Sequence, residues 1–173
     1  MKVPKGIITH SGRVIDLKNI NPDDILIEDI AWGLSMTNRW GGQCNEPYSI
    51  AQHSMAVARM CNRQDKLAGL MHDASEAYIC DMPSPAKILL PDYHELEKKL
   101  MGVISEKFEF QYPMSLDVKA VDKLMAQIEY TDLMLGEDDN DRTDFLTTKR
   151  QTQREVYDGF MKMYEAVQFS IIK

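Results

Sequence analysis

The segment His72-Asp73-Ala74-Ser75-Glu76 places one imidazole and two carboxylates within a short stretch of chain. On a helix, Glu76 lies four residues after His72 and three after Asp73, so it shares a face with both. His72 and Asp73 themselves diverge by ~100° around a helix axis. A metal ion can therefore lie between them only if other elements complete its coordination.

Suitable partners for this pair are His53, which lies on the preceding predicted helix, and an aspartate from a later helix. Imidazole and carboxylate ligands together suit zinc, manganese, iron(II), cobalt or magnesium. Two histidines and two aspartates leave positions open for water and substrate in an octahedral site, as catalysis requires. Spacing alone does not distinguish this site from hydrogen-bonded core histidines, because His-Asp pairs are common by chance.

Apolar periodicity, caps and prolines divide the chain into mainly helical segments. The first helix is expected to begin at Asn21-Pro22 and to continue through Leu34. Further helices are expected over five segments: Ser49 to Asn62, Asp65 to Ile79, Tyr93 to Phe108, Leu116 to Leu135 and residues 156–167. Residues 81–85 should break the pattern, because two prolines so close cannot lie inside a helix. The turn signal Ser11-Gly12 predicts a small hairpin over residues 7–17. The expected fold class is all-α, as a single domain over residues 1–173, with this small N-terminal β-hairpin.

Length, composition and charge narrow the class of protein. The chain has 173 residues, of which 44% are hydrophobic and 27% are charged, as in a soluble globular domain. A net charge of −7 gives no electrostatic basis for binding long nucleic acid. No stretch approaches the ~20 apolar residues of a membrane helix, and the N-terminus does not resemble a signal peptide. The three scattered cysteines form no disulfide pattern, so we expect a cytoplasmic protein with no membrane partner.

Five segments, in order, resemble the HD-domain phosphohydrolases, and most closely the branch of bacterial 5′-deoxynucleotidases and small phage deoxynucleotide triphosphohydrolases. They are Asn38-Arg39-Trp40, Gln52-His53-Ser54, His72-Asp73-Ala74-Ser75-Glu76, the stretch from Asp81 to Lys87, and the stretch from Val118 to Asp122. One such segment would be weak evidence, whereas five in the same order are specific. The resemblance covers residues 38–122, about half of the chain.

The resemblance implies that one divalent ion is bound by His53, His72, Asp73 and Asp122. Asp122 lies on the apolar side of its predicted helix, next to Val121. A buried carboxylate there needs a partner, which a cation supplies. The plainer alternative is an aspartate on the helix surface, which would not need apolar neighbours.

The resemblance also assigns the residues that act on the substrate. Glu76 would handle the protons of the attacking water and the leaving oxygen. Arg39 would bind the phosphate through its planar guanidinium, and Lys87 and Lys119 would line the same phosphate site. For the two lysines, solubilising surface charge is the competing interpretation.

Two further residues are implied to recognise the nucleoside. Trp40 would offer a stacking face and a steric wall for the sugar and base, unless it is simply a core aromatic. Asp81 would accept a hydrogen bond from the 3′-hydroxyl, unless it caps the turn before Pro83.

The leading functional hypothesis is metal-dependent hydrolysis of deoxynucleoside 5′-monophosphates to a deoxynucleoside and phosphate. The rival is a dNTP triphosphohydrolase that releases triphosphate, because both enzymes place the α-phosphate at the metal. A non-catalytic nucleotide-binding module is less consistent with an intact Glu76 and a full set of ligand types. The expected partner is a small nucleotide, and the resemblance favours a homo-oligomer.

Overall fold

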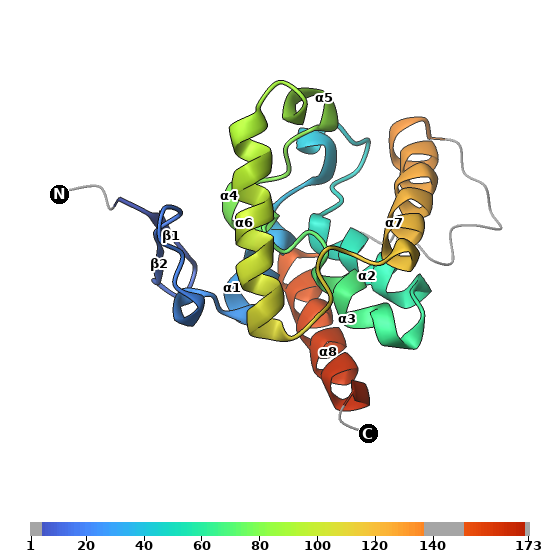
Figure 1. Ribbon diagram of the computed structural model, residues 1–173. Coiled ribbons are helices and arrows are strands. Elements are labelled where there is room, and N and C mark those ends of the chain that lie inside the picture. Colours follow the sequence, from blue (N-terminus) through green and yellow to red (C-terminus); the bar gives the residue numbers. More distant parts are fainter. Residues whose placement is uncertain (1–4, 137–150, 172–173) are drawn as a thin grey trace.

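The computed structural model describes residues 5–136 and 151–171 and is mainly helical (Figure 1). Its helices are α1 (Ile27–Met36), α2 (Ile50–Met60), α3 (Lys66–Met71), α4 (Glu76–Ile79), α5 (Ser84–Lys87), α6 (Pro91–Phe108), α7 (Leu116–Glu129) and α8 (Gln153–Ile171). Near the N-terminus, β1 (Ile7–Ile8) pairs antiparallel with β2 (Val14–Ile15). The predicted fold class, all-α with a small hairpin, is confirmed. Among the described residues, no helix is both long and apolar enough to cross a membrane.

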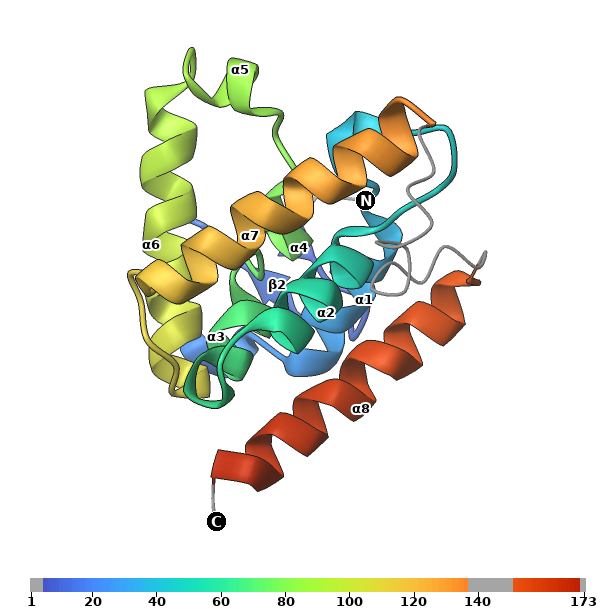
Figure 2. The same ribbon diagram turned by 90° about the vertical axis from the view of Figure 1, so that its right-hand side faces the viewer.

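Helix α2 lies at the centre of the molecule, between α7 on one side and α8 on the other (Figure 2). It also packs against α1 and α3. Every residue from Ile50 to Ala58 is consequently buried, including the polar side chains of Gln52 and His53. A helix enclosed on all sides is expected to be apolar all round. A histidine in its middle therefore needs a specific set of partners.

Local signals fix where the two site-bearing helices begin. Ser49 caps α2 in a capping box, in which its hydroxyl accepts from the Gln52 N–H while the Gln52 side chain accepts from the Ser49 N–H. Ser115 caps α7 by accepting from the Val118 N–H at 3.2 Å. The predicted start of α2 near Ser49 is confirmed.

The helix predicted from Asp65 to Ile79 is wrong as one element. It is divided into α3 and α4 by a tight turn over residues 72–75. In this turn the N–H of Ala74 donates to Met71 and the N–H of Glu76 donates to Asp73, each three residues back. Such bonding winds the chain more tightly than an α-helix, at ~3 residues per turn. His72 and Asp73 lie in this tightened segment.

The helix predicted to begin at Asn21 is also interrupted. Asn21 caps only a single 3₁₀ turn, Pro22–Asp24, and Ile25 is extended with its side chain fully buried. Burial of Ile25 in the core requires an extended backbone at this residue, so α1 begins two residues later.

The helix predicted to reach Leu135 ends its α-helical part at Glu129 and continues as a π-helical turn, Tyr130–Met134. The predicted break at 81–85 is confirmed for residues 81–83, but Ser84 and Pro85 already lie in the first turn of α5, where the missing N–H of proline is tolerated.

Close backbone packing of α1 on α4 sets the position of α4. A Cβ atom on Gly33 of α1 would lie 2.7 Å from the carbonyl oxygen of Ala77 and 2.9 Å from its Cα. These are backbone atoms, so they cannot rotate away. By contrast, a Cβ on Gly102 of α6 would meet no heavy atom within 4 Å.

Gly33→Ala should therefore destabilise the protein by about 1–3 kcal/mol, because α4 must shift to admit one methyl group. The matched control is Gly102→Ala, which should leave the free energy of unfolding unchanged or raise it by about 0.5–1 kcal/mol. Urea unfolding of both variants measures the difference. Equal stability of the two variants would contradict the close packing of α1 and α4.

Candidate metal centre

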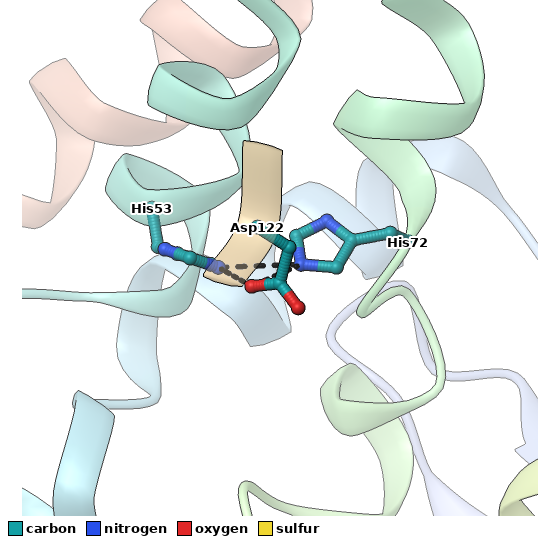
Figure 3. Close-up of side chains that lie close together, drawn as sticks. All are labelled: His53, His72 and Asp122. Carbon is teal, nitrogen blue, oxygen red and sulfur yellow. Dashed lines mark hydrogen bonds and ion pairs between the residues drawn. The ribbon is translucent and has the colours of Figure 1, made fainter. Parts of the chain in front are cut away.

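Three side chains from separate elements converge on one point (Figure 3). His53 comes from α2, His72 from the turn after α3, and Asp122 from the middle of α7. The Nε2 atoms of the two histidines are 3.2 Å apart, and Asp122 Oδ1 lies 3.0 Å from His53 Nε2 and 3.6 Å from His72 Nε2. This group, which we call the His53–His72–Asp122 group, can hold a metal ion.

Hydrogen bonds on the far side of each imidazole determine which nitrogen faces the centre. His72 Nδ1 lies 2.8 Å from the carbonyl oxygen of Gly69, which can only accept, so Nδ1 carries the proton of that bond. His53 Nδ1 lies 2.8 and 3.0 Å from the two carboxylate oxygens of Glu129 and donates to them in the same way. In the neutral tautomers fixed by these bonds, both Nε2 atoms present lone pairs to the centre.

The donor set fits a cation. Two lone pairs and a carboxylate oxygen that face one another repel unless positive charge lies between them. Ligands bound ~2.1 Å from one ion at right angles lie ~3.0 Å apart, which is close to the spacing of the His53–His72–Asp122 group. The residues present are therefore chemically and geometrically suited to a metal ion.

Asp73 adjoins this group. Its Oδ2 atom lies 3.0 Å from His72 Nε2 and 3.9 Å from His53 Nε2. The structure thus brings together all four side chains that the sequence resemblance assigned to the metal. The tight turn over residues 72–75 is what allows the adjacent His72 and Asp73 to face the same centre.

The carboxylates control the protonation of the site. Burial alone would lower the pKa of His72, but Asp73 and Asp122 outweigh it and raise the pKa well above its usual value. Burial alone would raise the pKa of Asp122, but its contacts with His53 and His72 hold that pKa well below its usual value. Without a metal, a proton on His72 therefore balances the carboxylates at neutral pH.

Metal binding should release a proton, because His72 must give up its Nε2 proton to become a ligand. Since the pKa of His72 is raised in the metal-free protein, affinity for Mn²⁺ or Zn²⁺ should rise by ~10-fold per pH unit until the pH reaches that pKa. Calorimetric titration between pH 6 and 8, in buffers of different ionisation heat, counts the released protons. The exposed His94 provides the control, and His94→Ala should keep the wild-type profile. Affinity independent of pH would contradict this description of the site.

Glu76, the first residue of α4, is buried at 4% exposure. Its Oε1 atom accepts from Lys87 Nζ at 3.3 Å, whereas Oε2 is buried and takes no hydrogen bond from the described residues. Burial, then the charges of Asp73 and Asp81, raise the pKa of Glu76 to about 9. Such a carboxyl can hold a proton at neutral pH and has a free oxygen to offer a ligand.

Arg39 lies beside the metal group with its side chain largely buried. Its Nε atom is 3.0 Å from Glu129 Oε2, and its Nη1 atom is 4.0 Å from Asp73 Oδ2. The guanidinium carbon also lies 4.8 Å from the centre of the Trp40 ring. The contact of Nε with Glu129 is an ion pair without a hydrogen bond, and the terminal nitrogens make only this one long ion pair within the described residues.

Trp40 and Asp81 are linked to each other at the edge of the site. Trp40 has a left-handed backbone, with φ 50° and ψ 34°, and its N–H donates to the Asp81 carboxylate at 3.2 Å. Left-handed geometry is costly for a residue other than glycine and is maintained by surrounding contacts. The structure thus shows Asp81 supporting the loop that carries Trp40. This backbone contact is one that the sequence did not indicate.

The two lysines differ. Lys87 Nζ lies 2.7 Å from Glu97 Oε1 and also contacts Glu76, so it reaches the site. Lys119 is exposed on α7 and forms no ion pair among the described residues. Its spacing from Asp122 predicted a shared face, but the structure does not bring Lys119 into contact with the other site residues.

Sequence reasoning missed Glu129, which hydrogen-bonds to His53 and forms an ion pair with Arg39. One signal was available, since Glu129 follows Asp122 by seven residues, or two helical turns, and so lies on the same face of α7. Tyr48, which donates to Glu129 at 3.0 Å, and Glu97, the partner of Lys87, gave no comparable signal.

Comparison with known proteins gives two relatives. Over 131 residues the chain is 43% identical to the uncharacterized protein YfdR of Escherichia coli K12, a match that covers 76% of this chain and 74% of YfdR. Over 133 residues it is 36% identical to an uncharacterized protein of Rhodobacter capsulatus, covering 69% of this chain and 68% of that protein. No family model matches. The chain belongs to the same protein family as YfdR.

Proposed function

We propose that this protein is a metal-dependent phosphohydrolase of the HD-domain type. Its reaction would be hydrolysis of the 5′-phosphate ester of 2′-deoxynucleotides, giving a deoxynucleoside and phosphate. The observation that carries the proposal is the composition of the site. The His53–His72–Asp122 group lies beside a buried, proton-holding Glu76 and a buried guanidinium, that of Arg39.

The bound ion, Arg39 and Glu76 would each have a distinct role in the reaction. A divalent ion, when bound, would polarise the phosphoryl oxygen and acidify a bound water. Arg39 would bind phosphate oxygens through its terminal nitrogens, since Nε faces Glu129 in an ion pair. Glu76, which holds a proton, would orient the attacking water, donate its proton to the leaving oxygen, and take up the proton of the attacking water in its place.

The charges of the site favour a monophosphate over a triphosphate. Arg39 is paired with Glu129, and Lys87 is paired with both Glu76 and Glu97. Within the described residues, Lys119 is the remaining cation proposed for the site, and it is exposed. A triphosphate carries about four negative charges and would need more unpaired positive charge than these residues supply.

A substrate panel tests the proposal. With Mn²⁺, Co²⁺, Zn²⁺ or Mg²⁺ supplied separately, the protein should release inorganic phosphate from dNMPs, and faster than from rNMPs. Asp73→Ala should abolish this release, because a carboxylate at the metal is lost. Triphosphate released from dNTPs would replace this proposal with the rival reaction. No turnover of any nucleotide with any ion would refute both.

Glu76→Gln should reduce kcat by ~10²- to 10⁴-fold, because the amide cannot exchange protons with water or the leaving oxygen. Metal affinity should stay at the wild-type level, since Glu76 lies outside the His53–His72–Asp122 group. Glu95→Gln, at an exposed glutamate of α6, is the matched control and should leave kcat unchanged. Full activity in Glu76→Gln would remove Glu76 from the proposed reaction.

A further inference from the structure

Glu129, the last residue of α7, is fully buried, with 0% of its surface exposed. Its Oε1 atom accepts from His53 Nδ1 at 2.8 Å and from the Tyr48 hydroxyl at 3.0 Å. Its Oε2 atom lies 3.0 Å from His53 Nδ1 and 3.0 Å from Arg39 Nε. One carboxylate thus contacts both a candidate metal ligand and the candidate phosphate-binding residue.

We propose that Glu129 is a positioning residue that orients His53 toward the metal and holds Arg39 beside it. The inference rests on the metal-binding part of the proposed function. Glu129 touches neither the proposed ion nor the substrate, so it would act entirely through these two neighbours.

The contact with His53 determines the orientation of the ring. Both carboxylate oxygens lie within 3.0 Å of Nδ1, so they hold its N–H and leave Nε2 to face His72 and Asp122. His53 and Glu129 are both at 0% exposure, so water cannot replace the carboxylate as acceptor without local opening of the structure. A carboxylate behind a ligating imidazole fixes the tautomer and makes the metal-facing nitrogen a stronger ligand.

The backbone of Arg39 is also held near Glu129, through Tyr48. The Arg39 N–H donates to the carbonyl oxygen of Tyr48 at 2.9 Å, while the Tyr48 hydroxyl donates to Glu129. The backbone and the side chain of Arg39 are therefore both anchored to a Tyr48–Glu129 pair. Because the ion pair with Glu129 is made at Nε, the terminal nitrogens remain available to an anion.

Glu129→Gln tests the proposal with little change of shape. The amide offers one acceptor oxygen where the carboxylate offered two, so its NH₂ group must face at least one of the donors that Glu129 accepted. Affinity for Co²⁺, measured by its absorption spectrum without substrate, should fall ~10- to 100-fold. The matched control is Glu95→Gln, the same substitution at an exposed glutamate of α6, and it should bind Co²⁺ as wild type does. A folded Glu129→Gln variant with wild-type Co²⁺ affinity would overturn the role at His53.

Kinetics at saturating metal test the role at Arg39. Once metal loading is restored, Glu129→Gln should still show a raised KM for the nucleotide, because Arg39 has lost its anchor. Glu95→Gln should show a wild-type KM. A wild-type KM in Glu129→Gln under these conditions would overturn this part of the proposal.

Nitrogen-15 NMR of the wild-type protein provides a test if Glu129→Gln does not fold. With Zn²⁺ bound, His53 should be protonated on Nδ1 and metal-bound through Nε2, and the opposite arrangement would overturn the proposal. Neither this measurement nor Co²⁺ binding uses a nucleotide. A wild type that hydrolyses no nucleotide, together with weakened Co²⁺ binding in Glu129→Gln, would therefore refute the proposed function and leave the role at His53 standing.

Discussion

Two imidazole nitrogens and a carboxylate oxygen meet at the centre of this structure, all with lone pairs directed at one another. Their orientation is imposed from behind, by Gly69 on one ring and by Glu129 on the other. Such a cluster is unfavourable unless a cation occupies it. In the metal-free protein a proton supplies this positive charge, and a metal ion can replace the proton. The positions of the surrounding helices are therefore constrained by the need to enclose one positive charge.

Enclosing charge in the interior of a small helical protein carries a desolvation cost, which pairing must offset. Helix α2 is buried on all sides yet carries His53, and α7 carries the fully buried Glu129. The guanidinium of Arg39 is the permanent cation among the side chains that contact Glu129. Burial would lower the pKa of Arg39, but Glu129 and Asp73 raise it, so the guanidinium remains charged. Arg39 is thus part of what makes a buried metal centre tolerable, as well as a group that can bind an anion.

The parts of the site that the sequence predicts are those specified locally. The capping box at Ser49 predicts the start of α2 and hence places His53 one turn into it. The parts that it does not predict depend on contacts distant in sequence. Ile25 is extended because its side chain is buried in the core. Residues 72–75 form a tight turn where the adjacent side chains of His72 and Asp73 must face one centre. Glu129 lies 76 residues from the histidine that it orients, and periodicity could indicate its face but not its partner.

Glu76 is positioned by backbone packing more than by its own side-chain bonds. Its one hydrogen bond among the described residues, from Lys87, comes from a side chain that Glu97 also holds. The start of α4 is instead fixed on one side by the tight turn that carries His72 and on the other by the approach of Gly33 to Ala77. A carboxyl proposed to take up and release protons would benefit from this arrangement, because strong side-chain bonds would fix its charge state. Rigid backbone contacts hold Glu76 in place and leave Oε2 without a hydrogen bond from the described residues.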